Sequence, residues 1–320
     1  MELSQIRELA DKVRANISSV LVGREATIDL VLNSLFCGGH VLLEDVPGVG
    51  KTMLARCLAK SFECEFKRVQ FTPDLLPSDI TGINYFDQKQ GEFVFRPGPL
   101  FANIVLADEI NRATPRTQSS LLECMEEGQV TVDGDTKKLE KPFFVIATQN
   151  PVETRGTFPL PEAQLDRFFM RLKMGYPSQQ EGIEILQRFK ENNPETELET
   201  VARAEAVLEA QACICEVKVS NAIEQYIVDI IEQTRHDEKI LLGVSPRGSI
   251  ALMRAAQINA IFDSRDFVIP DDVKKVSIPV LAHRLLLKGH AITGGTQNAG
   301  NAISELLMRV PVPTEEFWGV

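Results

Sequence analysis

The sequence predicts an α/β fold in which a parallel five-stranded sheet lies between helices and is followed by an all-α domain. The apolar run Val41-Leu42-Leu43 leads into a glycine-rich loop and then a helical pattern. Further short apolar strands alternate with helices up to Tyr176-Pro177, as in proteins built from βαβ units. Beyond that point only helical patterns follow. We therefore expect an α/β core at residues 1–177, and a linker helix with a helical domain at residues 178–320.

Two helices are expected before the first strand. Residues 3–20 place apolar side chains on one helical face, and residues 28–36 repeat this pattern. Val22-Gly23 lies in the connection between these helices. Residues 66–71 form the second expected strand.

The other strands of the sheet are short, fully apolar runs, typical of a parallel sheet that is covered on both faces. These runs are residues 104–107, 143–146 and 170–174. A helix around residues 121–125 separates the first two of them.

Two β-hairpins interrupt the alternation of strands and helices. The first spans about residues 83–95 and is closed by Arg96-Pro97-Gly98-Pro99. The second spans about residues 130–139 and turns at Asp133-Gly134, a dipeptide typical of tight hairpin turns.

Helical periodicity dominates the remainder of the chain. The expected helices lie at residues 183–189, 223–231, 249–261 and from residue 270 onward. The polar segments 192–200 and 289–301 are expected to be loops, and the second, rich in Gly, Asn and Thr, is expected to be mobile.

Composition is that of a globular protein: of 320 residues, 44% are hydrophobic and 25% charged. No apolar run approaches the ~20 residues that span a bilayer, and residues 1–5 show no secretory signal. The six cysteines are scattered without the spacing of a disulfide framework or a zinc site, which fits a reducing compartment. We therefore expect a cytoplasmic protein without membrane insertion.

The net charge argues against non-specific binding of nucleic acid as the main function. The formal net charge is −11, whereas proteins that bind nucleic acid non-specifically usually carry a basic surface. Lys137 and Lys138 in the second hairpin are a small basic exception, either in contact with a substrate or simply solvated.

The run Asp45-Val46-Pro47-Gly48-Val49-Gly50-Lys51-Thr52, with Met53 in the helix that follows, matches a phosphate-binding loop. In such a loop, backbone N–H groups and the helix N-terminus bind phosphate oxygens. Lys51 would reach the β- and γ-phosphates, and the Thr52 hydroxyl would hold Mg²⁺. Asp45 departs from the pattern, which has glycine there. A chance Gly-Lys-Thr is the alternative, and the flanking strand and helix disfavour it. The loop thus predicts nucleoside triphosphate binding.

Polar side chains follow two of the buried strands. Asp108-Glu109 comes at the carboxyl end of one strand, where ligands bind in open α/β sheets. Asp108 would help to hold Mg²⁺, and Glu109 could polarise the attacking water as a general base. Asn150 ends the next strand and could orient that water. The pattern predicts hydrolysis, although an acidic loop and a turn asparagine are the plainer readings of each motif alone.

Taken together, these motifs resemble the MoxR branch of the AAA+ ATPases over nearly the whole chain. The resemblance is carried by residues 43–52, 107–112, 147–151, 160–168, 245–247 and 279–284. Asp45 is itself part of the branch's pattern.

The resemblance implies a role for each motif. Residues 45–52 match Walker A, Asp108 and Glu109 match Walker B, and Asn150 matches sensor 1. Arg167 matches the arginine finger that acts on the neighbouring subunit's γ-phosphate, and Arg247 matches sensor 2 on the lid of the same subunit. The remaining implied assignments are the adenine pocket at Val22-Gly23, a helix-2 insert at residues 83–95 and a pre-sensor-1 hairpin at residues 130–139.

The resemblance also implies ATP or ADP with Mg²⁺ as ligands, and a homo-oligomeric ring, expected to be a hexamer, with both hairpins facing its pore. Expected partners are proteins with von Willebrand factor A domains and a client protein complex. The expected activity is ATP hydrolysis that drives remodelling, maturation or metal insertion of those clients.

Several alternatives stay open at this point. A nucleic-acid motor of the helicase type shares both hairpins, and a nucleotide-switched binding module would hydrolyse ATP only slowly. Arg167 could form a surface salt bridge, and Arg247 could simply begin a helix. Arg112 could face a subunit interface or the solvent.

Overall fold

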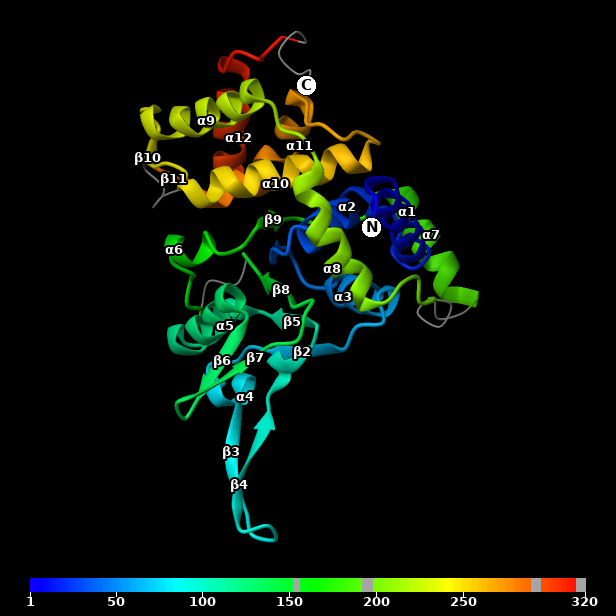
Figure 1. The fold of residues 1–320 in the computed structure, drawn as a ribbon, viewed down its shortest axis with the longest axis vertical. Helices are drawn as coiled ribbons and strands as arrows, with labels where there is room; N and C mark the ends of the chain where they lie inside the picture. Colours follow the sequence, from blue (N-terminus) through cyan, green and yellow to red (C-terminus); the bar gives the residue numbers. More distant parts are fainter. Residues whose placement is uncertain (152–155, 192–197, 289–294, 315–320) are drawn as a thin grey trace.

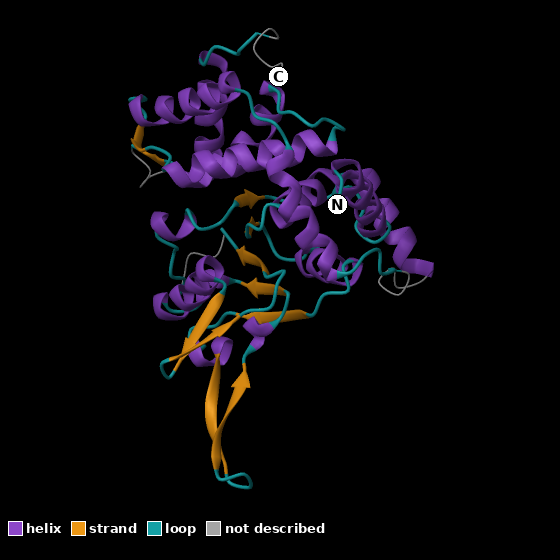
Figure 2. Cartoon of the chain, viewed as in Figure 1, coloured by secondary structure: helices purple, strands orange, loops and turns teal. Residues whose placement is uncertain are grey.

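The computed structural model describes residues 1–151, 156–191, 198–288 and 295–314. The strands of the main sheet lie in the middle of the molecule, and helices α9 to α12 form one end (Figure 1). The hairpin of β3 and β4 projects from the opposite end. Figure 2 shows the same division, with helices gathered at one end and most strands in the other part.

The first part of the chain alternates between helices and strands, with two hairpins inserted. Its elements are α1 (Leu3–Ser18), α2 (Glu25–Phe36), β1 (Val41–Glu44), α3 (Lys51–Ser61), β2 (Phe66–Gln70), α4 (Pro77–Thr81), β3 (Gly82–Asp87), β4 (Glu92–Pro97), β5 (Ile104–Asp108), α5 (Pro115–Glu127), β6 (Gln129–Val132), β7 (Asp135–Lys138), β8 (Phe144–Gln149), α6 (Glu162–Leu165) and β9 (Met170–Leu172).

Five parallel strands form the central sheet in the order β2-β5-β8-β1-β9. The central strands β1, β5 and β8 are almost wholly buried, because helices cover both faces of the sheet. One hydrophobic cluster joins the sheet to α1, α2 and α3, and a second joins it to α5. The predicted fold class is therefore confirmed.

Both predicted hairpins are present. Strands β3 and β4 pair over six residues each, and β6 and β7 pair over four. Gly82 begins the first hairpin at φ +94, where a Cβ atom would lie 2.5 Å from the carbonyl oxygen of Arg96. Further along, Phe86 and Phe93 stack edge to face at 5.4 Å, and 53% and 73% of their surfaces are exposed. The strands of this hairpin thus carry an exposed aromatic pair next to the polar turn at residues 87–91.

The second part of the chain is helical, apart from one short antiparallel ribbon. Its elements are α7 (Gln179–Glu191), α8 (Ala204–Cys213), α9 (Asn221–His236), β10 (Ile240–Leu242), α10 (Pro246–Phe262), α11 (Pro270–Leu281), the 3-10 turn η5 (Ala282–Arg284), β11 (Leu286–Leu287) and α12 (Gly295–Arg309). The ribbon pairs β10 with β11, and helical periodicity alone gave no sign of it.

Two expectations about this part need correction. Helix α8 was not predicted, because its apolar side chains are mainly alanines, which give little periodicity. Residues 295–301 form the start of α12, so the prediction of a loop is wrong there. Their Gly- and Asn-rich composition is overridden because the helix buries Ile303 and Leu306 further along. Residues 192–197 and 289–294, also expected to be loops, lie outside the described residues.

The helical part packs closely on the first two helices of the chain. The main hydrophobic cluster runs from α1 and α2 into α8, α9, α10 and α11. The buried Asn33 side chain on α2 donates a hydrogen bond to the carbonyl oxygen of Ala255 on α10 at 2.9 Å. Because the core continues across residue 177, the domain boundary at that position stays a prediction. None of the described helices is both long and apolar enough to cross a membrane.

Candidate functional site

The predicted phosphate-binding loop joins β1 to α3. Gly48 and Gly50 adopt φ values of +84 and +97, which glycine reaches without steric cost. Gly50 is the N-cap of α3, and no side chain caps the first N–H groups of that helix. These groups and the positive end of the helix dipole can therefore bind an anion. The Lys51 ammonium donates a hydrogen bond to the carbonyl oxygen of Asp45 at 2.8 Å, across the loop.

Asp45 has a structural role that explains its departure from glycine. Its Oδ2 accepts hydrogen bonds from the backbone N–H groups of Met174 and Gly175, both at 2.6 Å, and Oδ1 accepts one from Val46 at 2.9 Å. The side chain is 8% exposed. Asp45 thus ties the loop to the segment that leaves the last strand of the sheet.

Asp108 lies at the end of β5, beside the loop. Its Oδ1 accepts a hydrogen bond from the Thr148 hydroxyl at 2.6 Å, and its Oδ2 accepts two from the Arg68 guanidinium at 2.6 and 3.1 Å. Burial lowers the pKa of Lys51, and the surrounding carboxylates, that of Asp108 first among them, limit this decrease. The Asp108 carboxylate is therefore fixed in position and faces the lysine.

Glu109 adopts a left-handed backbone conformation, with φ +56 and ψ +50. This conformation is unusual for a residue other than glycine and costs about 1–2 kcal/mol. It is held because the Glu109 N–H donates to the Thr148 hydroxyl oxygen at 2.8 Å. The Oε2 atom of Glu109 accepts hydrogen bonds from Gln70 at 2.7 Å and Arg112 at 2.9 Å. Arg112, whose environment the sequence left open, therefore pairs with the candidate base.

These groups line one pocket of about 520 Å³ at the carboxyl ends of the strands. Of the predicted site residues, the pocket brings together Pro47, Gly48, Gly50, Lys51, Thr52, Met53, Asp108, Glu109 and Asn150. Asn150 is 6% exposed. The structure therefore unites the loop, the two acids and the asparagine as predicted. Val46 and Val49 belong to the same loop but do not line the pocket.

Val22 and Gly23 lie beside the loop rather than in the pocket. The preceding residue, Leu21, approaches Gly50 so closely that a Cβ added to Gly50 would lie 3.0 Å from its Cδ2. Gly23 adopts φ +67 and faces the Glu181 side chain at the start of α7, which would have to move to admit a Cβ atom. Their predicted role in holding an adenine base is thus untested.

Arg167 and Arg247 lie together, away from this pocket. Arg167 Nε is 3.3 Å from Oε2 of Glu126, and Arg247 forms an ion pair with Oε1 of the same carboxylate. In this structure Arg247 does not line the nucleotide pocket of its own chain, because the packing of the helical part places the start of α10 against α5. Its expected role as sensor 2 stays a prediction.

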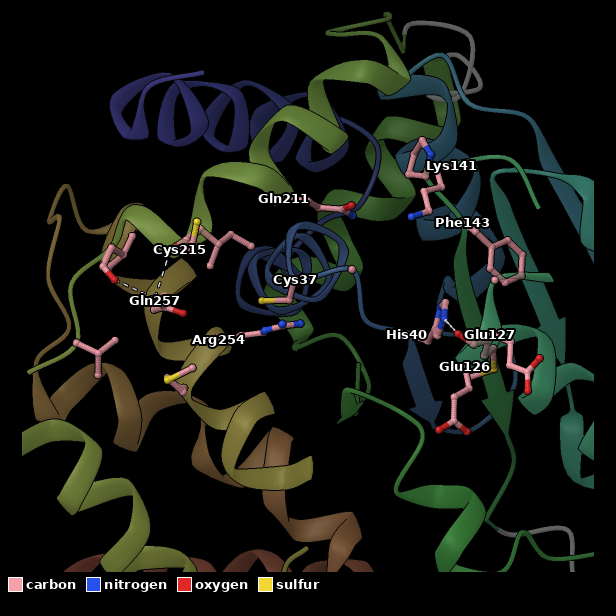
Figure 3. A pocket seen from close by; sticks show the side chains of 18 of the residues that line it. Cys37, His40, Glu126, Glu127, Lys141, Phe143, Gln211, Cys215, Arg254 and Gln257 are labelled. Atoms are coloured by element: carbon pink, nitrogen blue, oxygen red, sulfur yellow. Dashed lines mark hydrogen bonds between the residues drawn. The ribbon is translucent and has the colours of Figure 1, made fainter. Parts of the chain in front are cut away.

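A cavity of about 850 Å³, lined in part by Glu126, lies between the α/β core and the helical part (Figure 3). His40, Glu126 and Phe143 line one side, and Arg254 and Gln257 the other. Burial raises the pKa of the Cys37 thiol, so this group is not a reactive thiolate. The residues expected to bind nucleotide do not line this cavity.

Sequence reasoning missed four residues of the site, of which Arg56 lies on α3 and lines the pocket. Arg68 and Gln70 lie on β2 and reach Asp108 and Glu109, and Thr148 links both acids to β8. The register pairs Gln70 directly with Asp108, a relation that appears only once β2 is known to lie beside β5. Thr148 could have been found from the sequence, because it lies two residues before Asn150, which directly follows the same strand.

The donor groups in the pocket suit a magnesium nucleotide better than a protein-bound metal. Among the residues that the structure describes, no three His, Cys, Asp or Glu side chains are grouped as metal ligands. The Thr52 hydroxyl and the Asp108 carboxylate are oxygen donors in one pocket, as Mg²⁺ prefers when phosphates and water complete its coordination.

Comparison with known proteins gives matches over both parts of the chain. Residues 40–170 match the ATPase family associated with various cellular activities (AAA), and residues 232–304 match the AAA lid domain.

Whole-chain relatives agree with these matches. The uncharacterized protein YeaC of Bacillus subtilis is 51% identical over 310 residues, 97% of each chain. Chaperone MoxR1 of Mycobacterium tuberculosis is 40% identical over 285 residues, which cover 86% of this chain and 75% of the relative. The crystal structure of a candidate ATPase from Cytophaga hutchinsonii has a TM-score of 0.89 at 38% identity and covers 98% of both chains.

Proposed function

Because the chain belongs to the MoxR family of AAA+ ATPases, we propose that it hydrolyses ATP with Mg²⁺ and uses the energy to remodel other proteins. The observation that carries the proposal is the single pocket that unites Lys51, Thr52, Asp108, Glu109 and Asn150. A pocket of this composition can bind a triphosphate and also activate a water molecule.

In the proposed binding mode, the N–H groups of the loop and the Lys51 ammonium hold the β- and γ-phosphates. Bound Mg²⁺, held by Thr52 and through water by Asp108, would neutralise charge on the phosphate oxygens. The hydrogen bond from Lys51 to the carbonyl oxygen of Asp45 keeps the lysine across the mouth of the loop, ready to exchange that oxygen for a phosphate.

Glu109 is the proposed general base, and Asn150 orients the attacking water. In the structure, Gln70 and Arg112 both donate hydrogen bonds to Oε2 of Glu109. One of these hydrogen bonds must be released, or must pass to Oε1, before Oε2 can take a proton from water. Asp108, held from two sides, keeps its place meanwhile.

Arg167 and Arg247 are proposed to act on the nucleotide of a neighbouring subunit. Both point to Glu126, and neither lines the nucleotide pocket of its own chain. An arginine supplied in this way stabilises charge on the transferred phosphoryl group and contributes ~10³–10⁵ in rate. Hydrolysis would then require assembly, and we propose a homo-oligomeric ring, expected to be a hexamer.

The clients and cellular location belong to the proposal as well. The relative described as a chaperone supports action on proteins. Partners with von Willebrand factor A domains and metal insertion into clients are drawn from the family resemblance alone. A cytoplasmic location is proposed because the scattered cysteines fit a reducing compartment. The exposed pair of Phe86 and Phe93 on the first hairpin offers an apolar contact for such a client.

The test compares ATP turnover and ATP binding in the wild type and in Glu109→Gln. We expect the variant to bind ATP and to turn it over at least ~100-fold more slowly, since a general base contributes 10²–10⁴ in rate. Lys51→Ala, which should lose ATP binding itself, is the control. Unchanged turnover in Glu109→Gln would remove Glu109 from the mechanism. Strong, salt-sensitive stimulation by DNA would favour the nucleic-acid motor instead.

A further inference from the structure

Asp166, one residue before Arg167, is held by two elements of the helical part. Its Oδ1 forms an ion pair with Nε of Arg284 at 2.9 Å. Its Oδ2 accepts a hydrogen bond from the Ser245 hydroxyl at 3.0 Å. Ser245 is the N-cap of α10, and Arg284 ends the turn η5, so one carboxylate joins both to the loop before β9.

Arg284 holds the same loop through its backbone. The guanidinium donates hydrogen bonds to the carbonyl oxygens of Phe168 at 2.9 Å and Phe169 at 3.3 Å. Nε2 of His283 also lies within hydrogen-bond distance of the Phe168 oxygen, at 2.9 Å. The Arg284 side chain is only 2% exposed. A surface salt bridge would be worth little, but a buried guanidinium with several oxygen partners fixes the geometry around it.

The space around Arg284 is closed on the side of α10. A Cβ atom added to Gly248, in the first turn of that helix, would lie 3.0 Å from Cδ of Arg284. Arg284 is therefore enclosed between the loop before β9 and the beginning of α10. It cannot change its conformation without moving one of them.

These contacts fix Arg167 and Arg247 relative to each other. Arg167 follows Asp166 directly, and Arg247 follows Ser245 by two residues. Both guanidinium groups reach the same carboxylate of Glu126. The two arginines thus belong to one rigid group that includes the lid.

We propose that Arg284 is a positioning residue that locks Arg167 to the lid, so that the lid and the arginine finger of a subunit move as one body. The inference rests on the proposed action of Arg167 on a neighbouring subunit. It adds a route of communication, because nucleotide-driven rotation of one lid moves the finger at the next subunit's site.

The primary variant is Arg284→Lys, which keeps the charge but loses the planar group that reaches several oxygens. We expect kcat for ATP hydrolysis to fall roughly 10- to 100-fold, since a displacement of about 1 Å at a reacting group can cost that much. The affinity for a fluorescent ATP analogue should stay unchanged. The matched control is Arg265→Lys, which alters another lid arginine; its partners among the described residues, Asp263, Phe267 and Asp272, all belong to the helical part.

Subunit mixing distinguishes a positioning role from general damage. Lys51→Ala subunits cannot use ATP but present a normal finger to their neighbours. If Arg284 acts through Arg167, adding these subunits should restore turnover at the intact sites of Arg284→Lys subunits. Damage to the variant's own site would not be rescued in this way.

Mixing Arg167→Ala with Lys51→Ala distinguishes the positioning role of Arg284 from the proposed action of Arg167 between subunits. Rescue of Arg167→Ala without rescue of Arg284→Lys overturns the positioning role and leaves the proposed function intact. Rescue of neither overturns the proposed action between subunits, and the positioning role with it. If thermal melting shows that Arg284→Lys is not folded, Asp166→Asn replaces it in the mixing experiment. That variant removes the same ion pair with little change in side-chain shape.

Discussion

Replacing Asp45 with glycine makes the loop conform to the general phosphate-binding pattern, yet we expect it to destabilise this protein. The Asp45 carboxylate accepts backbone hydrogen bonds from Met174 and Gly175, both at 2.6 Å. Glycine would leave both N–H groups without this partner. The sequence pattern alone predicts no loss of stability on this substitution, whereas the hydrogen bonds of Asp45 predict one. The stability of the variant therefore decides between these two predictions.

The magnitude follows from those contacts. Hydrogen bonds to a charged group are worth about 1.5–3 kcal/mol each, and water can replace part of that at the half-buried Gly175. We therefore expect a loss of about 2–4 kcal/mol in the free energy of unfolding. For a chain of this length, this corresponds to a decrease of roughly 3–6 °C in Tm. Asp45→Asn, which keeps one acceptor oxygen, should lose about half as much.

Urea unfolding and thermal melting of the nucleotide-free proteins measure this effect. The expected order of stability is wild type, then Asp45→Asn, then Asp45→Gly, with similar urea m-values. A glycine variant that melts within about 1 °C of the wild type would refute the reasoning, because the carboxylate bridge would then contribute nothing measurable.

Three further predictions concern other contacts. Burial lowers the pKa of His40 from 6.5 to about 4. As the pH falls from 6.5 to about 4, the unfolded chain therefore binds a proton that the folded chain does not. The free energy of unfolding should decrease by about 3 kcal/mol over this range. His40→Gln should flatten that part of the stability–pH curve, and a curve parallel to the wild type would exclude the assignment. Thr148→Val should lower kcat at least ~10-fold with ATP binding retained, because Asp108 and Glu109 lose their common hydrogen-bond partner. An unaltered kcat would show that Thr148 does not position the two acids. Gly248→Ala should lower Tm by a few degrees despite the better helix propensity of alanine, because its Cβ would lie 2.3 Å from Cγ1 of Val244 and 3.0 Å from Cδ of Arg284. A higher Tm would show that these side chains move aside at no cost.

The nucleotide pocket could be predicted because its chemistry is encoded in short runs. Residues 45–52 and the Asp108-Glu109 pair each follow a buried strand, and parallel strands bring their carboxyl ends to one edge. The types and positions of these side chains are therefore fixed once the strands are recognised.

The partners of those side chains could not be predicted in the same way. Gln70 reaches Glu109 only because β2 lies beside β5, and the order of strands is not written in any local pattern. The position of Arg247 depends on how the helical part packs against α2 and α5, which involves contacts between residues far apart in the sequence. Local motifs therefore gave the chemistry of the site, whereas tertiary packing decided which groups restrain it.

The strand order has a consequence for the synthesis of the chain. Strand β1 is made first, but its two neighbours in the sheet are β8 and β9, which follow it by about a hundred residues or more. Until those strands leave the ribosome, the apolar β1 has both edges unpaired. Pairing over such separations is slow, and exposed edges favour aggregation. We therefore expect the nascent chain to be prone to aggregation until residue 172 has emerged from the ribosome. The phosphate-binding loop should become ordered only afterwards.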